Sequence, residues 1–202
     1  MAHFNDILPT GVDIQSMEFI SNQATVATQS LSGRQQIRSF GGQYWSARIT
    51  MSPMTRDDLR QVYAFLIKQK GSFTTFTIAP TNLTEVSGSG DGDVALGGTS
   101  AIGTTTLTLG ASTANQYKAG DMIIINPSGG TPVHTKAYMV TDNNTNATLN
   151  IEPELVVAVE ADDTIYSYTN FKLTVRLVGD TYSYNVDETG FGVLEFDVVE
   201  AI

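Results

Sequence analysis

The segment from Gly33 to Ile78 constrains the fold more than any other, because it places one strong helical pattern between strand-like stretches. Thr55 is a good N-cap, and Asp57 and Asp58 put negative charge into the first turn, where it favours the helix dipole. The spacing predicts a helix over residues 55–70, followed by a C′ glycine at Gly71. Its apolar stripe is expected to comprise Leu59, Val62, Tyr63 and Leu66.

The stretches on either side of this helix have the pattern of strands. From Tyr44 to Met51 polar and apolar residues alternate, and a period of two puts one set of side chains on the core face of a sheet. A second strand is predicted from Phe73 to Ile78. Together these patterns predict a core that includes Trp45, Ile49, Leu59, Val62, Leu66, Phe73 and Phe76.

The composition shifts at Pro80 toward short strand-like runs separated by turns rich in Gly, Asn and Asp. Many short strands at even spacing are typical of a small barrel or sandwich. Longer alternating stretches return at Phe171–Leu177 and Gly192–Val199. We therefore predict a mainly β (α+β) fold. Its core would be a β-sandwich with one flanking helix, built from residues 1–79 and 170–202, and residues 80–169 would form an inserted small β domain.

The protein is acidic, with a formal net charge of −10, which argues against nucleic-acid binding as its main function. Its basic residues are nevertheless concentrated before Gly71. One interpretation is that they lie on unrelated solvated faces. The other is that they form a basic edge, which packs head-to-tail against an acidic edge in a ring. The candidate interface residues are Arg34, Arg38, Arg48, Arg56 and Arg60.

The chain contains no cysteine, which excludes disulfides, thiolate zinc ligands and cysteine nucleophiles. Its first residues lack the pattern of a signal peptide, and no apolar run approaches the roughly 20 residues of a membrane-spanning helix. We expect a soluble protein that is made in a cytoplasm and does not insert into membranes.

The residues offer little for catalysis or metal binding. His3 and His134 are the only histidines, and no Gly-x-Ser-x-Gly elbow accompanies them. Asp91 and Asp93 resemble part of a calcium loop but lack its remaining ligands, so a solvated turn is the simpler interpretation. An acid–base pair needs two carboxylates that face one cleft, and for Glu160, Asp162 and Asp163 a charged connector between domains is the better interpretation. We expect no enzyme activity, metal or cofactor.

The aromatic residues leave an alternative function open. A set of them could form a sugar-stacking face, although aromatic residues on strands more often lie in a core or an interface. The protein would then be a carbohydrate-binding β module, which predicts a monomer with an exposed aromatic platform within residues 81–168. The set comprises Tyr44, Trp45, Tyr63, Tyr166, Tyr168, Tyr182 and Tyr184.

Several short motifs follow one another along most of the chain. They are Ser32-Gly-Arg-Gln, Gly42-Gln-Tyr-Trp-Ser-Ala-Arg-Ile-Thr, Pro53-Met-Thr before the helix, Lys70-Gly-Ser-Phe-Thr-Thr-Phe-Thr-Ile, Lys118-Ala-Gly-Asp and Ile151-Glu-Pro. This ordered pattern resembles distal tail proteins and related baseplate proteins of tailed bacteriophages. The chain departs from the family at Pro153-Glu-Leu-Val, where many members have Pro-Pro-Leu-Arg.

The resemblance implies a tail-tube-like fold, with two packed sheets and one helix, that closes into a hexameric ring. Such a ring forms the last layer of the tail tube in the virion and carries the hub and the receptor-binding or peripheral baseplate proteins. DNA would pass through its lumen without specific binding. A tail-tube, tube-initiator or adaptor protein of an adjacent layer is the alternative within this class.

Overall fold

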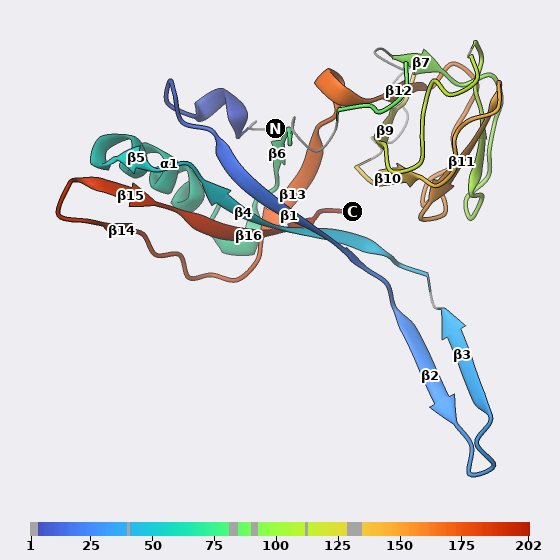
Figure 1. Cartoon of the computed structure of the whole chain (residues 1–202), viewed down its shortest axis with the longest axis horizontal. Coiled ribbons are helices and arrows are strands. Elements are labelled where there is room, and N and C mark those ends of the chain that lie inside the picture. Colours follow the sequence, from blue (N-terminus) through green and yellow to red (C-terminus); the bar gives the residue numbers. More distant parts are fainter. Residues whose placement is uncertain (1–3, 40, 81–84, 90–92, 112, 129–134) are drawn as a thin grey trace.

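Figure 1 shows the computed structural model of the chain, which describes residues 4–39, 41–80, 85–89, 93–111, 113–128 and 135–202. The fold is mainly β, as predicted: within these residues one α-helix accompanies sixteen strands. Most strands belong to two sheets, one formed by both ends of the chain and one by its middle. We call the first part the core and the second the barrel.

The core contains a five-stranded antiparallel sheet in the order β1-β4-β16-β13-β6. The helix α1 (Arg56–Lys68) lies beside this sheet and buries its apolar stripe. Most side chains on the helix-facing side are buried, and most of those on the other side are exposed or half-buried. The strands are β1 (Ile14–Asn22), β4 (Tyr44–Met51), β6 (Phe76–Ile78), β13 (Leu173–Leu177) and β16 (Glu195–Glu200).

The helix forms where the sequence predicts it. The Thr55 hydroxyl accepts a hydrogen bond from the backbone N–H of Asp58 at 3.4 Å, so Thr55 is the N-cap. The helix ends at Lys68, two residues before the predicted end, because the backbone enters the left-handed region at Lys70 (φ 56°) and stays there at Gly71 (φ 65°). Four phenylalanine rings fill the space between helix and sheet, with neighbouring centroids 5.4–6.2 Å apart: Phe4, Phe65, Phe76 and Phe196.

Six of the seven predicted core residues are buried, and the prediction for Phe73 was wrong. Phe73 is 81% exposed, because Gly71–Phe73 forms the 3-10 turn η2 and β6 begins only at Phe76. In a continuous strand, residues three positions apart point to opposite faces of the sheet. A single strand over these residues could therefore not have placed both Phe73 and Phe76 in the core. The buried residues are Trp45, Ile49, Leu59, Val62, Leu66 and Phe76.

The barrel is a six-stranded sheet in the order β7-β12-β9-β10-β11-β8. Its two end strands meet, because Leu96 and Leu109 form an isolated antiparallel bridge just beyond β7 and β8. The interior has its own apolar cluster, which includes Tyr117 and Tyr138. The strands are β7 (Val94–Ala95), β8 (Thr106–Thr108), β9 (Met122–Asn126), β10 (Ala137–Val140), β11 (Thr148–Glu152) and β12 (Thr164–Tyr166).

Three smaller features complete the described fold. A three-stranded sheet lies at the start of α1, where β15 (Phe191–Val193) pairs with β5 (Met54–Thr55) on one side and with β14 (Asn185–Val186) on the other. A hairpin of β2 (Thr25–Gln29) and β3 (Gln35–Ser39) extends the β1–β4 pair away from the rest of the molecule (Figure 1). Short 3-10 turns occur at η1 (Asn5–Ile7) and η3 (Tyr168–Asn170).

Candidate functional site

Two of the residues first considered for chemistry, Asp93 and Asp163, have structural roles, whereas Glu160 and Asp162 are exposed. Asp93 accepts hydrogen bonds from the side-chain amide of Asn170 at 2.9 and 3.0 Å. Asp163 is buried and accepts the backbone N–H groups of Ser128 and Glu160, so it stabilises a turn rather than facing a cleft. His3, His134 and Asp91 lie outside the described residues.

The residues that the structure describes contain no cluster of three or more His, Cys, Asp or Glu residues suited to a metal ion. Nor do they contain a helix that is long and apolar enough to cross a membrane.

The described aromatic residues of the barrel do not form an exposed platform. Tyr117 and Tyr138 are fully buried, and Tyr166 and Tyr168 are only half-exposed. Trp45 is 5% exposed and stacks on Phe19 in the core, with ring centroids 4.9 Å apart. The described residues of the barrel therefore give no support to a sugar-stacking function.

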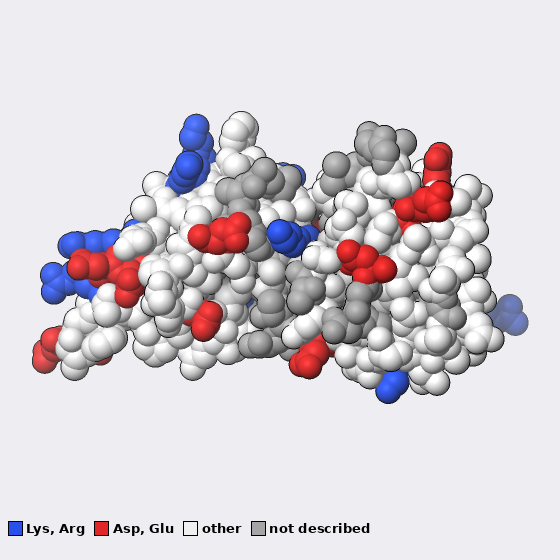
Figure 2. Space-filling model, turned by 90° about the horizontal axis from the view of Figure 1, so that it is seen from above, with Lys and Arg blue, Asp and Glu red and all other residues white. Residues whose placement is uncertain are grey.

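The five candidate interface arginines are not brought together into one basic edge. Arg34 lies at the end of the β2–β3 hairpin and Arg38 on β3, whereas Arg48 lies on the open face of the core sheet and pairs with Asp197 at 3.1 Å. The other two, Arg56 and Arg60, lie on α1. Figure 2 shows basic side chains at the α1 end of the molecule interspersed with acidic ones. The hairpin and the helix are thus separate basic elements.

The hairpin is the least covered element of the described structure. All ten of its strand residues are exposed, and none belongs to either apolar cluster. Val26, Ile37 and Leu31 present large apolar side chains to solvent, with Leu31 fully exposed at the tip. A two-stranded hairpin is at best marginally stable alone, and exposed apolar side chains favour a partner surface.

The core and the barrel are joined by a buried polar cluster that the sequence did not reveal. Lys136, just before β10, donates from Nζ to Glu200 Oε2 at 2.6 Å, and to the carbonyl and Oε1 of Gln43 at 2.6 and 2.8 Å. Glu200 also accepts the backbone N–H groups of Ala137 (2.7 Å) and Trp45 (3.1 Å). We call these five residues the Lys136–Glu200 cluster.

Electrostatics and packing explain why this cluster holds the two parts together. Burial lowers the pKa of Lys136 and raises the pKa of Glu200, while their mutual attraction opposes both shifts. The indole N–H of Trp45 donates to the Ala137 carbonyl at 2.9 Å, so a side chain of the core provides the hydrogen-bond donor for a backbone carbonyl of the barrel. Met122 and Ala137 of the barrel pack into the apolar cluster of the core. The barrel is therefore fixed in orientation on the core.

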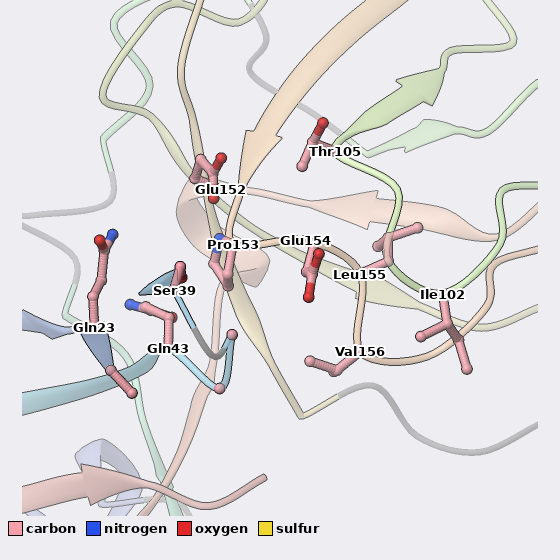
Figure 3. Close-up of a pocket in the computed structure, with 13 residues that line it drawn as sticks. Gln23, Ser39, Gln43, Ile102, Thr105, Glu152, Pro153, Glu154, Leu155 and Val156 are labelled. Carbon is pink, nitrogen blue, oxygen red and sulfur yellow. The ribbon is translucent and has the colours of Figure 1, made fainter. Parts of the chain in front are cut away.

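A pocket of about 930 Å³ lies between the base of the hairpin and the barrel, next to this cluster. In Figure 3, Gln23, Ser39 and Gln43 lie on one side, while Glu154, Val156 and Ile102 lie on the other. Among the described residues that line it, Glu152 and Glu154 are the only charged ones, and both are exposed. We call this space the basal pocket.

Comparison with protein-family models and with curated protein sequences finds no match to this chain. The arrangement itself provides a protruding hairpin, an open sheet face and a fixed barrel. Such an arrangement can make contacts with other proteins.

Proposed function

We propose that this protein is a structural component of a bacteriophage tail, which forms a ring at the distal end of the tail tube and joins the tube to baseplate and receptor-binding proteins. The observation that carries this proposal is the long β1–β4 strand pair, whose extension, the β2–β3 hairpin, contributes no strand residue to either apolar cluster of the described structure. The ordered motifs that resemble distal tail proteins add to it. A tube, tube-initiator or adaptor protein of an adjacent layer would use the same features.

Unsatisfied edges and exposed apolar residues support self-association. β1 is the end strand of the core sheet, so one edge of its nine residues has no described neighbour. Closing a ring would pair such edges between subunits and remove the hazard of uncontrolled aggregation. Of the thirteen large apolar residues exposed in the described structure, only Ile102 belongs to the barrel, and the others lie on the core and the hairpin.

The open face of the core sheet suits a lumen. Its outward-facing charges are Glu18, Glu195 and Asp197 against Arg48 and Arg176, with the register placing Glu18, Arg48 and Asp197 in one row across β1, β4 and β16. A slightly acidic wall would repel phosphate and let DNA pass without binding. The barrel contacts the opposite face of this sheet, through Trp45 and Glu200, and would remain available to neighbouring tail proteins.

Light scattering at low and high protein concentration, combined with electron microscopy of negatively stained particles, tests the proposal. We expect closed rings, with a mass corresponding to six copies for the hexamer. Replacing residues 25–39 with a short turn should yield a folded monomer, because the hairpin contributes to neither apolar cluster. The matched control, Lys172→Glu at an exposed position just before β13, should still assemble.

A strictly monomeric wild-type protein at all concentrations would contradict the proposal. Assembly that persists without the hairpin would contradict the role assigned to that element. Circular dichroism of each variant establishes that a loss of assembly is not a loss of folding.

A further inference from the structure

We propose that the hairpin tip of one copy, residues 30–34, docks into the basal pocket of the next copy, where Leu31 contacts Ile102 and Arg34 pairs with Glu154. The inference rests on the proposed function, since it names the contact by which copies associate. It commits to a second copy of this chain as the occupant.

The basal pocket has the chemistry to receive a basic and aliphatic segment. Its charged lining residues, Glu152 and Glu154, form no ion pair within the described structure. Ile102, 66% exposed, lines the same pocket and is the barrel's one large exposed apolar residue among those described. Uncompensated carboxylates beside an exposed aliphatic side chain favour a partner that supplies an arginine and an apolar group.

Backbone geometry keeps the pocket open beside Glu154. Gly41 has a left-handed φ of 67°, and a Cβ at this position would lie only 3.2 Å from Glu154 Oε1. Gly42, with φ of 69°, continues the same turn. A larger residue at Gly41 would therefore be strained and would crowd the carboxylate that the pocket presents.

The hairpin carries the complementary set. Between Gln23 and Gln43 the only charged residues are Arg34 and Arg38, in a protein whose net charge is −10. Neither arginine forms an ion pair in the described part of the chain. Leu31, three residues before Arg34 in the tip, is fully exposed. Both the charge and the apolar surface of the tip thus match those of the pocket.

A chain cannot satisfy its own pocket in this way. The pocket is lined by the hairpin base, at Gln23, Ala24 and Ser39. The five-residue strands β2 and β3 separate this base from the tip by roughly 17 Å, at about 3.3 Å per residue. The contact is therefore between copies, and since it joins two different surfaces it is head-to-tail, which is the type of contact that closes rings.

Disulfide cross-linking tests the contact directly, because the wild-type chain contains no cysteine. Leu31→Cys and Ile102→Cys are prepared as separate proteins, mixed at the concentration where the wild type assembles, and oxidised. We expect a disulfide-linked dimer containing one copy of each variant. The control mixture pairs Leu31→Cys with Val178→Cys, where Val178 is an exposed apolar residue of the core. It should give at least about tenfold less disulfide-linked dimer.

Charge reversal provides the second test. Arg34→Glu and Glu154→Lys should each raise the concentration needed for half-assembly about tenfold or more, because each places like charges together. The double variant, Arg34→Glu with Glu154→Lys, should restore assembly toward the wild-type concentration. Lys172→Glu, at an exposed position just before β13, should change the half-assembly concentration little.

The results separate this contact from the ring itself. If the wild type forms rings but the Leu31–Ile102 cross-link is no stronger than the control, or the double reversal fails to restore assembly, the contact is overturned while the ring stands. If the wild type never assembles, both are overturned. Capture of the hairpin tip by a different tail protein would then be the outcome to examine.

Discussion

Lys136 Nζ lies 2.6 Å from Glu200 Oε2, and both side chains are completely buried at the junction of core and barrel. The two residues come from different parts of the fold, one entering β10 of the barrel and one ending β16 of the core. A buried ion pair stabilises a structure only while both partners are present, because either charge alone would be buried without compensation.

Lys136→Met should lower the free energy of unfolding by about 3–5 kcal/mol, since it leaves the Glu200 carboxylate buried without a counter-charge. Urea unfolding followed by the fluorescence of Trp45, the only tryptophan in the chain, measures this change beside the altered contact. Combining Lys136→Met with Glu200→Leu should recover most of the loss. A loss below about 1 kcal/mol for the single variant would show that the pair contributes little.

The matched control is the exposed pair of Arg48 and Asp197, whose side chains are 60% and 48% exposed. Arg48→Met should leave the free energy of unfolding nearly unchanged, because water screens the exposed charges.

The deficit of Lys136→Met should also depend on pH. Burial raises the pKa of Glu200 above its ordinary 4.5. A carboxyl group whose pKa is raised in the folded state stabilises the fold while it is protonated. Its contribution to the free energy of unfolding is fully present below pH 4.5 and is lost as pH rises through the folded-state pKa. Without Lys136 this shift should grow, so the variant should approach wild-type stability in acid and fall behind as pH rises. A deficit that is the same at every pH would contradict this.

Trp45→Ala should destabilise the protein by about 3–5 kcal/mol, because it removes a buried indole that stacks on Phe19. Trp45→Phe keeps most of the volume and loses the hydrogen bond to the Ala137 carbonyl, so it should cost about 1–3 kcal/mol. Denaturant unfolding followed by circular dichroism measures both. Equal losses for the two variants would indicate that the hydrogen bond, and not the packing, carries the stabilisation.

Stability should fall in alkaline solution as two barrel tyrosines ionise. Burial raises the pKa of Tyr117 and of Tyr138 to about 12, from the ordinary 10. The contribution of these two tyrosines to the free energy of unfolding is therefore fully present below pH 10 and is lost as pH rises toward about 12. Urea unfolding at a series of alkaline pH values tests this, and Tyr138→Phe should make the dependence shallower. An unchanged pH dependence in that variant would exclude Tyr138 as a cause.

Gly97 permits the closure of the barrel. A Cβ at this position would lie 2.8 Å from the Cα of Gly110 and 2.9 Å from the Leu109 carbonyl, where the two end strands meet. Gly97→Ala should therefore cost about 1–3 kcal/mol through overpacking. Gly98→Ala is the neighbouring control, since its Cβ would meet only Thr108 at an ordinary 3.7 Å. Thermal unfolding of the two variants should differ, and equal stability would show that the strands can move apart.

The sequence by itself determined the local elements of this protein. Thr55, Asp57 and Asp58 predict the start of α1, and the alternation from Tyr44 to Met51 predicts β4 with Trp45 and Ile49 facing inward. These features depend on interactions between neighbours in the chain, which periodicity and capping report. The prediction for Phe73 was wrong because Gly71–Phe73 forms a 3-10 turn and not the start of a strand. The pattern of Phe73 and Phe76 in the sequence does not report that backbone conformation.

Only the tertiary structure decided where the charges lie. Glu200 shares the inward parity of Phe196 and Val198, a signal of a buried acid, but nothing in the pattern identifies Lys136 as its partner 64 residues away. Likewise the arginines gathered along the sequence are separated in space onto a hairpin, a sheet and a helix. Contacts between distant segments follow from how sheets and barrel pack together, and local sequence does not encode that arrangement.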